Sequence, residues 1–310
     1  MKTRITMLKL LIASCCAFVT TAVFGQTTFT WTNSAGGDLA VSNNWDPNGL
    51  PSGATQDTAQ WDGVATGNLT ITYGNTSLPS TGYGSSGINL VLTANQTGSV
   101  KIVSSVSVSQ GVGVNNITVN NGAGAFSLGD GSANNLKVFG RPAGGIHTFE
   151  NDSTNPATID SSVEFQAGGG NGYTYDFYGP GDWIVNSYLY PDNGAFSGTT
   201  ILIEGPGSVI WSAGRIIPNS PVGGITISGG ALVIKSSGVV PNQTIDVEGT
   251  LEYDAAAQSQ TFSGTIVGAG LLEVNDGTLT LSAQNTYVGN TALSGGELVV
   301  NGAENAGSSG

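Results

Sequence analysis

A short unit recurs in the second half of the chain, and its spacing restricts the folds that the chain can adopt. Each copy has an alternating apolar triplet, a turn that ends in glycine and a second alternating run, as in Ile225-Thr226-Ile227, Gly230 and Leu232-Val233-Ile234. The turn glycines of the four copies are Gly230, Gly249, Gly277 and Gly296, so the first and last intervals are equal and the middle one is longer. We interpret the longer interval as an insertion of the strand-turn unit 264–270. A spacing of about 20 residues is typical of one coil of a parallel β-solenoid, with glycine at its corners.

Alternation with a period of two residues also precedes these repeats, in runs such as Leu69–Tyr73, Ile117–Val119 and Ile201–Ile203. Turn-forming residues bound each run, and no amphipathic helix is evident after residue 25. We therefore expect an all-β fold, a right-handed parallel β-solenoid (β-helix) with Val, Ile and Leu inside and Thr and Ser outside. About a dozen coils spaced about 4.8 Å apart would form a rod on the order of 60 Å long. A sandwich of antiparallel hairpins is the alternative that the same alternation permits.

The segment 1–25 has the layout of a secretory signal peptide. Three basic residues lead into the apolar run Leu10–Phe24, and the small residue Gly25 precedes Gln26. The run has about 15 residues, fewer than the roughly 20 that a membrane-spanning helix needs. We expect cleavage between Gly25 and Gln26 and export to the cell surface or the extracellular space. A retained membrane anchor, or lipidation at Cys15, are the alternatives.

Export leaves an acidic chain without cysteine. Both cysteines and three of the eight basic residues lie in the signal segment, so its removal changes the formal net charge from −13 to −16. The exported chain can therefore form no disulfide, although its compartment would allow one. Its few Lys and Arg residues are scattered, which disfavours nucleic acid as a partner. We expect membrane contact only through secretion or through a C-terminal anchor that this sequence lacks.

The segment 26–65 differs from the rest, because it places Trp31, Trp45 and Trp61 among Gly, Asn and Pro residues. A solenoid needs a cap on its first coil, and large aromatic side chains suit that purpose. We expect an N-terminal cap here, with exposed tryptophans that stack on a ligand as the alternative. Irregular coils are expected over 66–222 and the repeated coils over 223–310.

Residues 263–300 resemble the autotransporter-associated β-strand repeat, also called the passenger-associated transport repeat. Three segments carry the resemblance: Gly277-Thr278-Leu279-Thr280-Leu281-Ser282, Asn285-Thr286-Tyr287-Val288-Gly289-Asn290-Thr291 and Gly295-Gly296-Glu297-Leu298. The pattern departs from the family near Glu273, where a lysine is common, and at Asn290, where glycine is usual. The resemblance implies a β-helical passenger region at the bacterial outer membrane, with a role in secretion, adhesion or matrix building. Since the pattern runs to the chain's end, we expect it to continue in a longer protein, unless the gene model is truncated.

No catalytic or metal-binding motif is evident, and we expect no catalytic residue, no metal and no cofactor. His147 is the only histidine, which excludes a histidine-based triad and a site with several histidines. Five carboxylates of the central region form no recognisable pair: Glu150, Asp152, Asp160, Asp176 and Asp182. A polysaccharide lyase or glycoside hydrolase stays as the enzymatic alternative.

Seven aromatic residues lie between Tyr173 and Tyr190. We favour cross-strand packing as their role. Contact with a glycan is the alternative, through Tyr173, Tyr175, Tyr178, Asp182 and Trp183. The sequence thus supports two hypotheses: a non-enzymatic, passenger-type β-helical stalk for adhesion or presentation, or a β-helix that binds or degrades carbohydrate. An extracellular polysaccharide, or a host or matrix surface, is the partner that both allow.

Overall fold

A computed structural model describes most of the chain after the expected signal segment. The described residues are 25–64, 66–74, 78–79, 86–106, 111–131, 136–140, 145–161, 163–167, 173–190, 200–212, 224–235 and 242–301. In these ranges the regular elements are β-strands and one short 3-10 turn, η1 (Ser42–Asn44). The expected signal peptide, apart from Gly25, lies outside the described residues.

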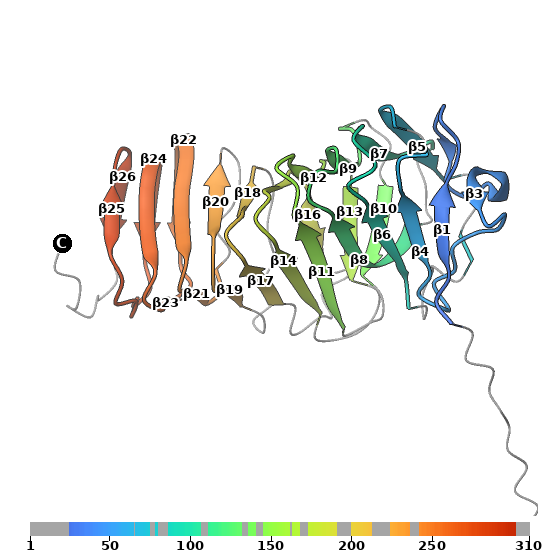
Figure 1. The fold of residues 1–310 in the computed structure, drawn as a ribbon. Coiled ribbons are helices and arrows are strands. Elements are labelled where there is room, and N and C mark those ends of the chain that lie inside the picture. Colours follow the sequence, from blue (N-terminus) through green and yellow to red (C-terminus); the bar gives the residue numbers. More distant parts are fainter. Residues whose placement is uncertain are drawn as a thin grey trace, which may run out of the picture.

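The strands form two sheets that run side by side along an elongated body (Figure 1). The main path of sheet A contains β1 (Thr28–Trp31), β4 (Thr58–Trp61), β6 (Ile88–Leu92), β8 (Gly111–Val119), β11 (Ile146–Asn151), β14 (Thr174–Tyr178), β17 (Thr200–Glu204), β19 (Ile225–Ile227), β21 (Ile245–Val247) and β23 (Ile266–Val267). Sheet B contains β2 (Gly37–Asp38), β5 (Leu69–Tyr73), β7 (Val100–Ser104), β9 (Phe126–Leu128), β12 (Ala157–Ile159), β15 (Trp183–Val185), β18 (Ser208–Trp211), β20 (Ala231–Lys235), β22 (Thr250–Phe262), β24 (Leu271–Leu281), β25 (Thr291–Leu293) and β26 (Glu297–Val300).

The chain alternates between the sheets, and each strand pairs in parallel with the strand one coil later. Ile201 pairs with Ile225, and Ile225 pairs in turn with Ile245. Among the pairings of the described residues, the one antiparallel pair joins β1 to β3 (Trp45–Asp46) at the N-terminal edge. The parallel solenoid is therefore confirmed and the antiparallel sandwich is wrong. The main path of sheet B implies a rod about 50 Å long at about 4.8 Å a strand.

Coils are shorter towards the C-terminus. In the last part of the rod Ile245 pairs with Ile225, whereas in the middle Phe149 pairs with Ile117, which is much farther away along the chain. Part of the extra length in the middle forms a third series of strands, which starts beside the first half of β8: β10 (Leu136–Gly140), β13 (Val163–Ala167) and β16 (Tyr188–Tyr190).

Stacked glycines mark the corner between the sheets, and they correct one expectation. A Cβ atom on Gly249 would lie 2.6 Å from the carbonyl oxygen of Gly230, and one on Gly270 would collide with the carbonyl oxygen of Gly249. Gly296 stacks instead on Gly277, at a second corner between the two halves of β24. The unit 264–270 is therefore no insertion, because β23 is the next regular strand. The longer interval in the sequence joins glycines of two different corners.

The core consists of columns of inward side chains from successive coils. Isoleucines at one position of β17, β19, β21 and β23 pair in register and are at most 1% exposed: Ile201, Ile225, Ile245 and Ile266. Full burial of such a side chain stabilises the fold by about 1.5–3 kcal/mol. Alternation in sequence thus becomes an apolar column along the axis.

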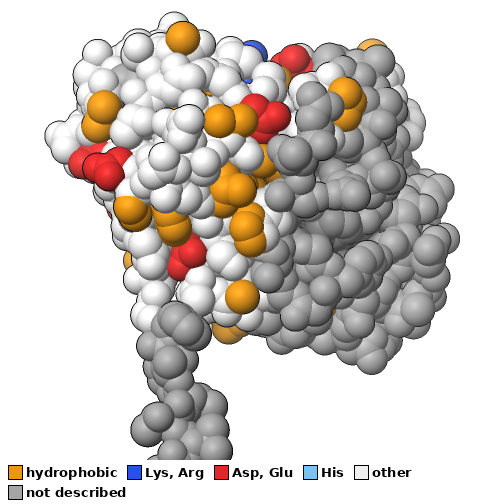
Figure 2. Space-filling view, turned by 90° about the vertical axis from the view of Figure 1, so that its right-hand side faces the viewer, with side chains coloured by type: hydrophobic (Ala, Val, Ile, Leu, Met, Phe, Trp, Pro, Cys, Tyr) orange, Lys and Arg blue, Asp and Glu red, His pale blue; other side chains and the backbone are white. Residues whose placement is uncertain are grey.

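Tryptophans close the N-terminal end, as the composition of 26–65 predicts. Trp31, Trp45 and Trp61 are at most 2% exposed, and the Trp31 and Trp45 rings meet edge to face at 4.9 Å. Trp45 Nε1 donates to the carbonyl oxygen of Leu39 at 2.9 Å. Figure 2 shows this end, where apolar side chains form separate spots among polar ones. The alternative of exposed, ligand-stacking tryptophans is wrong.

The other end is less covered. Val274 and Leu281 are fully buried, but their partners in the last described coil, Leu293 and Val300, are 58% and 41% exposed. Among the described residues, Leu293 and Val300 pack against one neighbouring coil, whereas residues of the inner coils pack against two.

We expect Gly249→Ala to lower the free energy of unfolding by about 1–3 kcal/mol, because the new Cβ would overlap the backbone of the preceding coil. Urea denaturation of the chain measures this. Gly67→Ala is the matched control, since a Cβ there has no atom within 4 Å, and its effect should stay within about 0.5 kcal/mol. Equal effects of the two substitutions would contradict the stacked-corner explanation.

Trp45→Ala should destabilise the chain by about 3–5 kcal/mol, because it leaves a cavity between two other tryptophans. Amide hydrogen exchange in β1 and β4 should accelerate first. Val41→Ala is the control on the same segment, since Val41 is 43% exposed. If Trp45→Ala lowered the free energy of unfolding no more than Val41→Ala does, the tryptophans would not be what stabilises the cap.

Candidate functional site

The outer face of sheet A carries side chains in rows that run along the rod. Residues that pair in register on successive strands share a row, although a whole coil of sequence separates them. One row crosses seven strands and consists of Thr30, Gln60, Val91, Thr118, Glu150, Tyr178 and Glu204. Its N-terminal part is uncharged and its later part is acidic.

The uncharged part borders an open groove of about 400 Å³, which we call the amide groove. Its lining is Gln26, Gln56, Thr58, Asn89, Val91, Asn115, Asn116 and Thr118. A volume of this order is within the range of about 300–1,000 Å³ that is usual for ligand sites. Amides and hydroxyls supply donors and acceptors, and none of the lining residues is charged.

A β-bulge builds the centre of the amide groove. Ile88 pairs with Val114 but Leu90 pairs with Ile117, so both Asn115 and Asn116 lie opposite Asn89. Asn89 Oδ1 accepts from Nδ2 of Asn115 at 3.1 Å and of Asn116 at 3.2 Å. In a regular strand these two asparagines would point to opposite faces. The bulge instead brings both to the outer face, as bulges beside functional sites often do.

Farther along sheet A lies a second feature, the carboxylate–tyrosine strip, formed by Glu150, Asp176, Tyr178 and Glu204. Burial raises the pKa of Asp176, and the nearby Glu204 carboxylate raises it further. The pKa of Glu150 is also raised, by burial first and by Asp152 second, while a hydrogen bond from Thr118 opposes the shift. Asp176 Oδ1 is buried and has no hydrogen-bond partner among the described residues.

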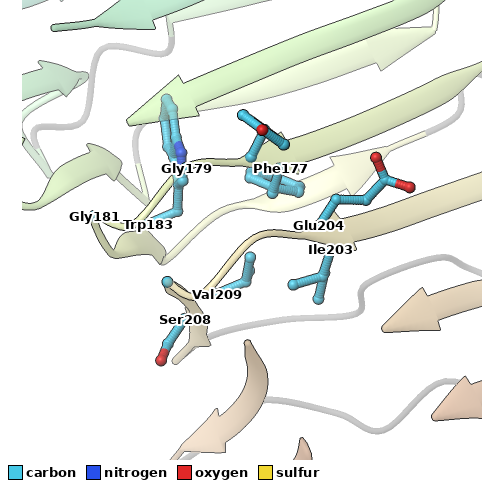
Figure 3. A pocket seen from close by; sticks show the side chains of 10 residues that line it. Phe177, Gly179, Gly181, Trp183, Ile203, Glu204, Ser208 and Val209 are labelled. Carbon is cyan, nitrogen blue, oxygen red and sulfur yellow. The ribbon is translucent and has the colours of Figure 1, made fainter. Parts of the chain in front are cut away.

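The strip ends at a small hollow beside the glycine corner (Figure 3). Tyr178, Glu204 and Ser208 are its polar lining side chains, and Glu204 and Ile203 project from opposite sides of β17. Its volume of about 10 Å³ is far below the usual range of about 300–1,000 Å³ for a ligand site. The hollow has room for about one water molecule and none for a sugar unit.

Three of the five residues named as candidate glycan contacts lie in the core. Tyr173, Tyr175 and Trp183 are at most 3% exposed. Tyr175 packs on His147 and Phe149 at ring distances of 5.7 and 5.8 Å. These three rings therefore offer no stacking surface, because alternation turns them inward.

The other two candidates are exposed but differ in role. Tyr178 is 46% exposed on the outer face of sheet A. Asp182 Oδ1 accepts from the backbone nitrogen of Ser208 at 3.0 Å, which ties two successive corners together. At the expected cleavage site, Gly25 and Gln26 are exposed at the start of the described residues. Gln26 Nε2 donates to Thr58 Oγ1 at 3.0 Å.

His147 is a core residue, fully buried, with its Nδ1 3.0 Å from the backbone oxygen of Asn115. Over the described ranges, no group of three or more His, Cys, Asp or Glu side chains could hold a metal ion. Nor do those ranges contain a helix with the length and apolar character to span a membrane.

The amide groove was not predicted. Its residues come from four different coils and form no motif along the chain. One signal was available: the doublet Asn115-Asn116 interrupts the alternation between Val112-Gly113-Val114 and Ile117-Thr118-Val119. An interruption of this kind indicates a bulge.

Comparisons with known proteins give no match: no family model, no curated protein and no solved structure is significantly similar to the chain.

We expect Asp176→Asn to stabilise the chain at neutral pH, by at most about 1 kcal/mol at this partly exposed site. The raised pKa means that the folded state holds its proton more tightly than the unfolded state. The contribution of Asp176 to stability is then complete below its ordinary value of 3.8 and is lost as the pH rises through the folded-state pKa.

The prediction is tested by thermal unfolding of the unchanged chain and of Asp176→Asn, from a pH below the ordinary pKa of Asp176 up to neutral pH. The melting temperatures of the two proteins should coincide below about pH 3.8 and should differ at higher pH, where the variant is the more stable. Asp246→Asn is the control, because Asp246 pairs in register with the uncharged Thr226 and Val267 on the same face. A stabilisation that does not depend on pH would rule out the explanation through burial and Glu204.

Proposed function

We propose that the chain is a non-enzymatic, exported protein of the cell surface or extracellular space, a passenger-type β-helical stalk for adhesion or presentation. The observation that supports this best is the continuity of the two parallel sheets from the capped end to β25 and β26. A rod of continuous parallel sheets sets a distance and displays its outer rows at regular intervals.

The segment 263–300, whose sequence resembles passenger-associated repeats, forms the last described part of the rod. Asn285 is buried, and its Oδ1 accepts from the backbone nitrogen of Ile266 in the preceding coil at 2.8 Å. Tyr287 is 8% exposed and its hydroxyl lies 2.7 Å from Thr291 Oγ1. The Asn285 contact thus joins one coil to the preceding coil, whereas the Tyr287 contact lies within its own coil.

An enzymatic role has less support. A glycoside hydrolase needs two carboxylates that face one cleft. Glu150 and Asp176 line neither the amide groove nor the corner hollow. The amide groove has no carboxylate in its lining and the corner hollow has Glu204 alone, so neither presents the pair that such an enzyme needs.

Expression of the full chain in a bacterial host tests the proposal. We expect an exported form whose first residue is Gln26, as measured by intact mass, and a scattering profile of an elongated β-rich particle. The purified exported form should adhere to a polysaccharide or matrix surface more strongly than an unrelated protein of similar size and charge. The control is a chain with charged residues in the segment Leu10–Phe24, which should stay inside the cell. An uncleaved intracellular product, or a compact particle, would overturn the proposal.

A further inference from the structure

We propose that the amide groove binds a neutral polysaccharide, with the sugar chain laid along the rod axis and across the strands. The inference rests on the adhesive function proposed above and names its ligand class and its surface. The side chains that carry it are Thr58, Asn89, Asn115, Asn116 and Thr118.

The charge of the groove selects a neutral ligand. Among its eight lining residues there is no Lys, Arg, Asp or Glu, whereas the chain as a whole carries a net charge of −13. An acidic polysaccharide would be repelled by the overall field and would find no cation in the groove. A neutral polysaccharide binds through its hydroxyl groups, so it needs no cation in the groove and the negative net charge does not repel it.

The hydrogen-bonding groups of the groove suit hydroxyls. Asn89 Oδ1 accepts two hydrogen bonds, and Asn116 Oδ1 accepts one from the backbone nitrogen of Thr148 at 3.0 Å. Each Nδ2 group of Asn89, Asn115 and Asn116 uses one of its two N–H groups in these bonds or in the bond to Gln56, so its second N–H can donate to a sugar hydroxyl. The bulge brings two asparagines to Asn89 Oδ1, and their amide donors hold it in place. Asn89 Nδ2 also donates to the backbone oxygen of Gln56 at 2.8 Å. The central side chain is therefore oriented before a ligand arrives, which reduces the entropy that binding costs.

The spacing of the groove suits a linear ligand. Thr58, Asn89 and the asparagine pair lie on three successive strands, which are about 4.8 Å apart. A pyranose unit in an extended chain advances by a comparable length, so each sugar can meet equivalent groups on each strand. Val91 lies in the row beside them and offers an apolar contact for the C–H face of a ring.

The same row continues to an aromatic platform. From Val91 it passes through Thr118 and Glu150 to Tyr178, three strands farther on and about 14 Å away. Tyr178 is 46% exposed, so a sugar ring can stack on it. A long oligosaccharide can reach from the amide groove to Tyr178, whereas a short one cannot.

Calorimetry with the exported form of the full chain tests the inference, with cellohexaose, maltohexaose and chitohexaose as neutral probes and hexagalacturonate as the acidic one. At least one neutral probe should bind, and its affinity should stay within about twofold between about 0.05 and about 0.5 M salt, because the probe carries no charge. Hexagalacturonate should bind more weakly than that probe.

Two variants locate the site. Thr58→Val with Thr118→Val should weaken binding about 5- to 10-fold through lost hydrogen bonds, with melting temperatures recorded for each protein. Thr226→Val is the matched control, a half-buried outward threonine of sheet A that is far from the groove. Tyr178→Ala should weaken the binding of the hexasaccharide but leave that of the corresponding trisaccharide unchanged.

Three results would overturn the inference: no binding of any neutral probe by the folded chain, equal or tighter binding of hexagalacturonate, or an affinity that the double variant leaves unchanged. A loss in Thr226→Val as large as that in the double variant would also overturn the assignment to the groove. An exported rod that binds none of the probes would contradict this inference alone. A chain that is not exported, or is compact, would contradict the proposed stalk instead.

Discussion

Close contact between the backbones of successive coils is the constraint on which the whole structure depends. Parallel pairing brings the coils to about 4.8 Å at the strands, and the corners must follow at the same spacing. Backbone hydrogen bonds continue through these corners, as from Glu248 N to Ile227 O at 2.8 Å and from Gly270 N to Val247 O at 2.6 Å. The carbonyl groups of one corner then occupy the space that a Cβ of the next would need. Glycine at these stacked corners is thus a steric requirement of the fold.

Other sources of stability contribute little by comparison. The Lys235–Asp254 ion pair is 3.2 Å long, but its side chains are 43% and 31% exposed, and such pairs contribute about 0–1 kcal/mol. Both cysteines, Cys15 and Cys16, lie in the expected signal segment, so a disulfide cannot hold the coils. The free energy of folding comes instead from backbone ladders and from apolar columns such as that of Ile225 and Ile245. A defect in one coil therefore affects its two neighbours most.

The sequence was sufficient for the fold class because alternation and glycine spacing are local signals of the coil. It was insufficient for the assignment of glycines to corners. Gly249 and Gly277 both stand between two alternating runs, although they belong to different corners. The sequence also left open which aromatic residues face inward. Tyr173, Tyr175 and Phe177 have one parity and are buried, whereas Tyr178 has the other and is exposed. Parity divides the residues between two faces, but only the packing decides which face is the core.

The same geometry explains why the candidate site could not be predicted as a motif. In the described strands of the two main sheets, core columns fill the inward positions, so the surface open to a ligand there is that of the corners and the outward rows. Neighbours within a row are one coil apart, and this separation along the chain is greater for Thr58 and Asn89 than for Glu150 and Tyr178, because coil length varies. No fixed interval therefore connects the members of a row. A binding surface of this kind can be read only after the register of every coil is known, and the bulge at Asn115 and Asn116 changes that register within the site itself.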